Sequence, residues 1–131
     1  MAENTSFHRG VALGWLLSAI VILALAADAA VDLFAPSLVG AQMEETGFPA
    51  GLATPVGLII LVCVVLYAIP RTAVLGAILT TGFFGGAICA HFRLAEIGSP
   101  SQLISLLLGV IAWSGLYLRD ERVRRLLPFV R

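Results

Sequence analysis

The sequence predicts an all-α membrane protein: a bundle of four transmembrane helices forming a single integral membrane domain over residues 1–131. Hydrophobic residues make up 60% of the 131 residues, and charged residues only 12%, whereas a soluble domain carries about 25% charged residues. So few charges cannot cover a water-exposed surface. The formal net charge is zero, which gives no indication of nucleic-acid binding.

Four apolar runs are long enough to cross a bilayer, which takes about 20 residues. They cover about residues 10–34, 50–69, 72–93 and 102–118. Pro70 and Arg71 leave only a tight connection between the second and third runs. Arg9, the run after it and residues 24–26 also resemble a signal peptide with its cleavage site. We expect this segment to be retained as the first span.

The arginines predict the orientation, because cytoplasmic loops are enriched in Lys and Arg. Arg9 precedes the first span, Arg71 lies between the second and third spans, and a basic tail, residues 119–131, follows the fourth. Both termini are therefore expected on the cytoplasmic side of the inner membrane. The tail fits an interfacial anchor on anionic lipid, and it fits a plain topology signal equally well.

The first outer connection, residues 35–49, is longer than a turn. Pro36 suits the first turn of a helix, and Gly47 suits the stop after its last turn. We expect a short amphipathic helix lying on the outer surface of the membrane.

The third span carries a face of small residues. Gly82, Gly86 and Ala90 are four residues apart and so lie close together around the helix, with Gly85 beside them. Because small residues let membrane helices approach closely, we expect this face to be a tight helix seam. A glycine-lined ligand path is the alternative.

Ionisable side chains gather near the outer ends of the spans. Asp28 and Asp32 are four residues apart and share one helix face. At about 1.5 Å per residue, Asp28 and His91 each lie about 28 Å from the inner edge of the bilayer. Arg93 lies on the glycine face, which makes it the better counter-charge for an aspartate, whereas His91 points elsewhere: to another helix, a cavity or the headgroups. The group is either a structural ion pair or a ligand or proton site.

The sequence indicates no metal, haem or iron–sulfur site and no catalytic constellation. Cys63 and Cys89 lie at different expected depths, too far apart for a disulfide, and no ligand set for a redox centre accompanies them. We therefore expect no cofactor and favour a protein that is not an enzyme.

Four stretches resemble one known family. They are DAAVDLFAP (28–36), ETGFP (45–49), the segment 65–93 with its PRTAVLGA…TG…GGA…H.R pattern, and GLYLRDERVRRLLP (115–128). In these stretches the sequence resembles the DoxX-like small membrane proteins. The resemblance implies a four-helix membrane bundle, with relatives that are membrane subunits of thiosulfate:quinone oxidoreductase, oxidoreductase partners or assembly factors.

Three polar residues of this chain match polar positions in the family pattern. Asp28, His91 and Arg93 occupy positions that match the family pattern, whereas Asp32 stands where the family usually has Lys. Two acids on one face thus replace an acid and a base, which makes Arg93 more necessary as a counter-charge.

Two functions follow as hypotheses. The first is a non-catalytic subunit or assembly partner of a membrane oxidoreductase complex. The alternative is a binder or processor of a small apolar molecule, such as a quinone or a lipid, at a pocket containing Asp28, His91 and Arg93. A proton- or ion-conducting role is disfavoured because no ionisable residue continues inward past Asp28. A homo-oligomer remains open.

Overall fold

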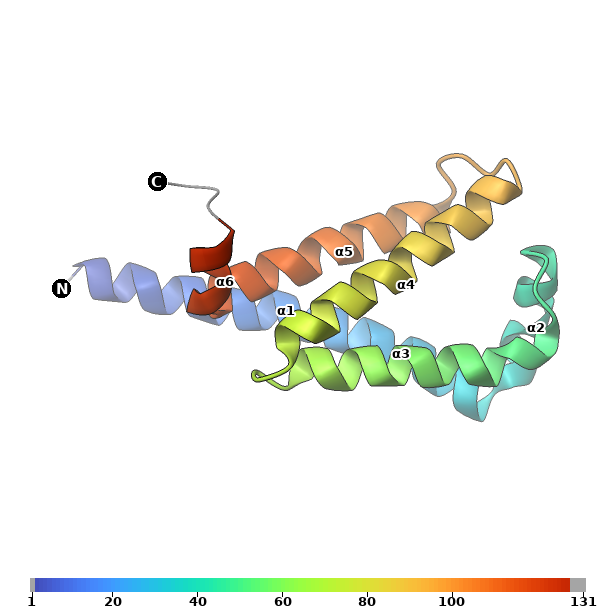
Figure 1. The fold of residues 1–131 in the computed structure, drawn as a ribbon, viewed down its shortest axis with the longest axis horizontal. Coiled ribbons are helices and arrows are strands. Elements are labelled where there is room, and N and C mark those ends of the chain that lie inside the picture. The colour runs from blue at the N-terminus through green and yellow to red at the C-terminus, as the bar shows by residue number, and fades with distance from the viewer. Residues whose placement is uncertain (1, 128–131) are drawn as a thin grey trace.

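The computed structural model describes residues 2–127, with side chains from Phe7 onward. The described residues form helices and no strands. In chain order the elements are α1 (Ala2–Phe34), α2 (Pro36–Glu45), the short 3-10 helix η1 (Ala50–Leu52), α3 (Ala53–Ala68), α4 (Ala73–Arg93), α5 (Pro100–Arg119) and α6 (Glu121–Leu126) (Figure 1). Stretches long and apolar enough to span a membrane are Phe7–Phe34, Ala50–Ala68, Ala73–Arg93 and Pro100–Arg119. These confirm the predicted all-α fold with four spans.

Helix α2 is the short helix predicted within residues 35–49. Pro36 is its first residue, and Gly47, just past its end, has a φ of 77°, which glycine adopts without strain. The amide of Gly47 donates to the Glu44 carbonyl and that of Phe48 to the Met43 carbonyl, both at 2.9 Å. The turn thus satisfies the last carbonyls of α2 and directs the chain into η1 and α3.

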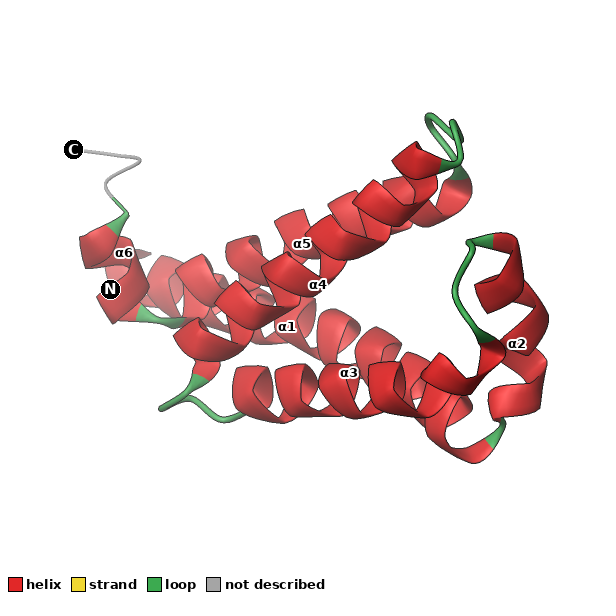
Figure 2. Ribbon diagram, turned by 45° about the vertical axis from the view of Figure 1, so that its right-hand side comes forward, coloured by secondary structure: helices red, strands yellow, loops and turns green. Residues whose placement is uncertain are grey.

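The four long helices form a ring of neighbours. Helix α1 packs against α3 and α5, and α4 packs against the same two helices. Both ends of the described chain lie at one end of the bundle, and α2 lies at the opposite end (Figure 1). Toward the α2 end, α4 and α5 diverge together from α1 and α3 (Figure 2). The bundle is therefore closed at the end that carries the termini and open at the end that carries α2.

The closed end is organised around Tyr67, a fully buried side chain near the end of α3. Its hydroxyl donates to the Ala112 carbonyl of α5 at 2.7 Å and lies 3.2 Å from the Ser18 hydroxyl of α1. Arg119 donates to the Tyr67 carbonyl at 2.9 Å, and its guanidinium lies 4.3 Å from the centre of the Trp15 ring. One side chain thus joins three helices, because its polar atom must find partners within the bundle.

Helix α6 is tied to the same end. The Asp120 carboxylate accepts from the Arg122 amide at 2.9 Å, and the Arg122 guanidinium donates to the Pro70 carbonyl at 2.8 Å. The hydrogen bond from the Arg122 side chain lowers the pKa of Asp120 below its usual value. This contact joins α6 to the α3–α4 turn. Phe129 and Arg131 of the predicted basic tail lie outside the described residues.

Glycines permit the closest helix approaches, but they are not the glycines that the sequence pattern singled out. A Cβ added at Gly14 would lie 2.8 Å from the Gly115 carbonyl oxygen, and one at Gly57 would lie 2.7 Å from the Asp32 Cβ. A Cβ at Gly76 would collide with the backbone of Tyr67. The contacts of α1 with α5, α1 with α3, and α3 with α4 therefore each contain a glycine.

The tight seam expected at Gly82, Gly85 and Gly86 is not found. A Cβ added at any of these three positions meets nothing within 4 Å among the described residues. The prediction of close packing within this chain is therefore wrong for them. The physical reason is that α4 diverges from α1 and α3 along this part of its length (Figure 2), so Gly82 and Gly86 line one hollow and Gly85 lines another.

We predict that Gly115→Ala destabilises the protein, whereas Gly82→Ala does not. A Cβ at Gly115 would lie 2.8 Å from the Ser18 hydroxyl oxygen and would force α1 and α5 apart, lowering the free energy of unfolding by about 1–3 kcal/mol. At Gly82 the better helix propensity of alanine leaves stability unchanged or raises it by up to about 1 kcal/mol. Thermal unfolding in detergent, followed by circular dichroism, measures both. An equal effect of the two substitutions would contradict the assignment of the close contacts.

Candidate functional site

A cavity of about 500 Å³ lies at the open end of the bundle. Helix α1 contributes Asp28 and Asp32, and α4 contributes His91 and the small residues Gly82, Gly86 and Ala90. The rest of the wall is mainly apolar and comes from α2, the α2–α3 connection, α3 and α4: Val39, Gln42, Met43, Thr46, Phe48, Val56, Ile59, Ile60, Phe83 and Ala87. Three of the four predicted polar site residues therefore line one cavity.

The two aspartates differ in their surroundings. Asp32 is only 4% exposed, because α3 packs against its backbone side at Gly57. Asp28 lies one turn earlier and is exposed. Among the described residues, neither carboxylate has a hydrogen bond or an ion pair. The cavity thus contains two acids on one helix face and no cation that neutralises them within the described chain.

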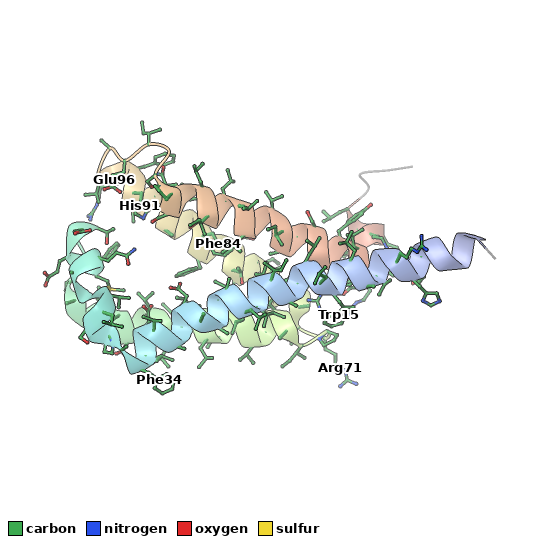
Figure 3. All side chains as sticks on the ribbon, turned by 180° about the vertical axis from the view of Figure 1, so that it is seen from behind. Trp15, Phe34, Arg71, Phe84, His91 and Glu96 are labelled. Carbon is green, nitrogen blue, oxygen red and sulfur yellow. The ribbon has the colours of Figure 1, made fainter. Side chains whose placement is uncertain are left out.

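His91 borders the cavity at the far end of α4. Its Nδ1 lies 2.7 Å from a carboxylate oxygen of Glu96 in the α4–α5 connection, and Figure 3 shows the two residues together at this end of the molecule. The His91 side chain is 14% exposed. The sequence left three environments open for His91, and the structure places it at the cavity with an acidic partner.

Arg93 does not pair with either aspartate, and this prediction is wrong. Its guanidinium donates to the Thr46 carbonyl at 2.8 Å and lies 5.7 Å from the centre of the Phe48 ring. Arg93 is the last residue of α4, where that helix has diverged from α1. The free carbonyl after α2 is therefore the partner it meets, and Arg93 joins α4 to the α2–α3 connection.

Several lining residues were missed by the sequence reasoning. Gln42, Met43, Thr46 and Phe48 come from α2 and the residues that follow it. The only signal for them is that residues 35–49 form a connection longer than a turn. Such a segment has room to fold back over the end of the bundle, but its sequence does not say which helices it covers.

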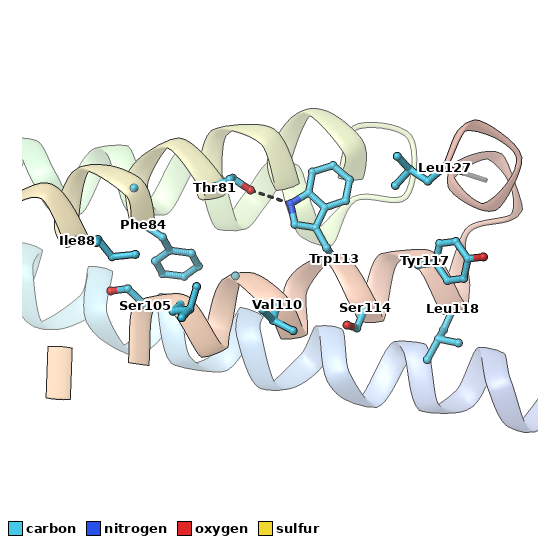
Figure 4. Close-up of a pocket in the computed structure, with 13 residues that line it drawn as sticks. Thr81, Phe84, Ile88, Ser105, Val110, Trp113, Ser114, Tyr117, Leu118 and Leu127 are labelled. Atoms are coloured by element: carbon cyan, nitrogen blue, oxygen red, sulfur yellow. Dashed lines mark hydrogen bonds between the residues drawn. The ribbon is translucent and has the colours of Figure 1, made fainter. Parts of the chain in front are cut away.

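A second hollow, of about 780 Å³, lies along α4 and α5 and reaches Leu127 (Figure 4). Its wall is almost entirely apolar, and the described residues that line it include no Asp, Glu, His or Arg. Its clearest polar contact is internal: the Trp113 indole donates to the Thr81 hydroxyl at 2.8 Å. This groove, although larger, offers a ligand little beyond apolar contact, so the aspartate-containing cavity is the better candidate site.

The described residues contain no group of three His, Cys, Asp or Glu side chains placed to hold a metal ion. Cys63 and Cys89 are both free, the first buried and the second exposed. The chemistry available at the cavity is therefore that of two carboxyl groups, an imidazole, an amide and a hydroxyl in apolar surroundings.

Comparison with models of protein families gives a match to one described as the DoxX-like family, over residues 16–115. The matched range contains every residue that lines the cavity. No curated protein matches the chain, and no solved structure matches it.

We predict that Arg93→Ala destabilises the protein more than His91→Ala. Arg93 joins two elements that are distant in the sequence through a hydrogen bond and a cation–π contact, together worth about 1–2 kcal/mol. His91 pairs with Glu96, which is half exposed and only five residues away, and such pairs contribute little. Unfolding temperatures in the same detergent compare the variants. Indistinguishable temperatures would mean that the Arg93 contacts do not hold the open end together.

Proposed function

The chain belongs to the DoxX-like family, and we propose that this multi-pass membrane protein binds a small, largely apolar molecule in the cavity at its open end. The observation that carries this proposal is the joint placement of Asp28, Asp32 and His91 in one apolar-walled cavity. Ligand sites are typically cavities of about 300–1,000 Å³ with apolar walls and a few convergent polar groups. The cavity has this size and this composition.

The position of the cavity along the membrane spans also supports ligand binding. Ionisable residues within membrane spans are costly and commonly mark binding or transport sites. The cavity is lined by residues of α1, α2, α3 and α4, and α2 lies at the end of the bundle opposite the termini (Figure 1). A ligand there can place an apolar body between the diverging helices and a polar group beside the aspartates. We assign no catalytic step to the site.

In this proposal the small residues of α4 leave room for the ligand. Gly82, Gly86 and Ala90 line the cavity, and the two glycines have nothing within 4 Å of an added Cβ. Their lack of side chains keeps the space between α4 and the opposite wall open. This supports the glycine-lined ligand path that the sequence left as the alternative to a seam.

The other expectations from the sequence stay predictions. The role of non-catalytic subunit or assembly partner, the quinone and a homo-oligomer have no described contact that bears on them. An inner-membrane location with both termini in the cytoplasm is supported by the arginine distribution. The first turns of α1, which contain Arg9, the α3–α4 turn with Arg71, and α6 lie at the closed end, opposite α2 (Figures 1 and 3).

We predict that Gly86→Leu abolishes ligand binding, whereas Gly85→Leu does not. Both glycines are exposed members of α4 with nothing within 4 Å of an added Cβ, but Gly86 lines the cavity and Gly85 lines the α4–α5 groove. A leucine at position 86 fills the cavity, and a leucine at position 85 is the matched control. Both variants are reconstituted in lipid nanodiscs.

The measurement is saturable photolabelling by an alkyl alcohol that carries a diazirine, with labelled peptides identified by mass spectrometry. Wild type and Gly85→Leu are expected to incorporate the probe into residues 39–48, with competition by unlabelled alcohol. Gly86→Leu is expected to lose this labelling about tenfold or more, by exclusion of the probe from its site. Equal, non-saturable labelling of all three proteins would contradict a ligand site in the cavity.

A further inference from the structure

We propose that the cavity selects molecules that carry an ammonium group on an apolar body, and that Asp32, with Asp28 beside it, holds the ammonium. This inference rests on the proposed function, because it names the class of ligand for the same cavity. The proposed function does not specify the charge of the ligand's polar group. The inference specifies a positive charge.

The first observation that supports ammonium binding is that a buried acid, Asp32, has no partner among the described residues. Asp32 is only 4% exposed and lines the cavity, yet within residues 2–127 its carboxyl group has no hydrogen-bond donor and no cation. The Asp32 carboxylate oxygens remain accessible, and the residue lines the cavity. A carboxylate in apolar surroundings without a partner is disfavoured, so a ligand that brings positively charged N–H donors gains an interaction that the described residues do not supply. Gly57 packs against the Asp32 Cβ, which fixes the side chain at the cavity wall.

The second support is that the nearby cationic side chains are engaged elsewhere. The sequence contains no Lys, and no Arg lines the cavity. Arg93 donates to the Thr46 carbonyl, and the Nδ1 of His91 lies against Glu96. Among the described residues no cationic side chain therefore pairs with the aspartates, and an ammonium group on a ligand would supply the missing charge.

The third support is the geometry of the two acids and the walls around them. Residues four apart on a helix lie one above the other on the same face, so Asp28 and Asp32 present their oxygens to one region. An ammonium group has three N–H donors and can meet oxygens of both carboxylates. Phe83 is part of the same wall, and aromatic faces attract cations as well as apolar groups.

The same features disfavour a neutral ligand that only accepts hydrogen bonds. A quinone would turn its carbonyl oxygens toward carboxylate oxygens, and both are acceptors. The Thr46 hydroxyl donates to the Met43 carbonyl at 2.8 Å. The side-chain donors left in the wall are therefore His91 on α4 and Gln42 on α2, and neither lies on the acid-bearing face of α1. The charge pattern therefore favours an amine over the quinone expected from the sequence.

The test compares two photoactivatable probes that differ only in their polar group. A diazirine-bearing alkylamine is compared with the corresponding alkyl alcohol, each on the protein in phosphatidylcholine nanodiscs at neutral pH. The amine is expected to label residues 39–48 at about tenfold lower concentration than the alcohol, because a hydrogen bond to a charged group is worth roughly a factor of ten or more. This comparison uses the unmodified chain and so does not depend on a variant that folds.

Substitutions then identify the acid. Asp32→Asn keeps the shape of the side chain and is expected to remove the preference for the amine while leaving alcohol labelling intact. Asp28→Asn is expected to reduce the preference in part. Glu44→Gln is the matched control, because Glu44 is an exposed acid at the same end of the molecule that does not line the cavity. A preference lost equally in Glu44→Gln would overturn the inference, since it would show only attraction to surface charge.

An ammonium group can belong to a lipid headgroup or to a free amine. A further experiment distinguishes these two sources. Replacing part of the phosphatidylcholine by phosphatidylethanolamine is expected to displace the amine probe if the natural ligand is a lipid headgroup, and to leave labelling unchanged if it is a free amine. Either result supports ammonium binding. Equal labelling by amine and alcohol in wild type and Asp32→Asn overturns this inference but leaves the proposed function standing. Absence of saturable labelling by both probes overturns the proposed function as well.

Discussion

The structure depends on one buried hydroxyl group that has to find its partners inside the bundle. Tyr67 joins α3 to α5 through the Ala112 carbonyl and to α1 through Ser18, in a part of the molecule where water is not available to replace either contact. Gly76 lets α4 approach Tyr67, and Gly14 and Gly115 let α1 and α5 approach each other nearby. These contacts all lie in the half of the bundle toward the termini.

The half of the bundle that carries α2 is less closely packed than the half that carries the termini. The helices pack closely at one end and diverge toward the other (Figure 2), where residues of α2 and its C-terminal turn form part of the cavity wall. The acids of α1 and the glycines Gly82 and Gly86 of α4 line the same cavity. Arg93, by contact with the Thr46 carbonyl, holds that turn against α4. A closed, hydrogen-bonded end and an open, acid-lined end are therefore two consequences of the same packing.

The sequence was sufficient to predict the spans and the short helix after the first span, because run length and turn residues are local properties. Depth along a helix placed Asp28 and His91 at one level, but the sequence left the surroundings of His91 open. It was not sufficient for the Arg93 partner or for the glycine seam. Both depend on how far α4 diverges from its neighbours, which is a property of the whole bundle. Gly57, Gly76 and Gly115 make the close contacts, and they do not form a stripe four residues apart.

The central claim is that the open end holds an ammonium-bearing molecule beside Asp32. The most direct measurement is an anomalous-scattering map from crystals grown in lipid with a bromine-labelled alkylamine. The account predicts a bromine peak inside the cavity, between Phe83 and the opposite wall, with the amine nitrogen within hydrogen-bond distance of the Asp32 carboxylate. Bromine found only in the α4–α5 groove or in the surrounding lipid, with the cavity empty of amine, would contradict it.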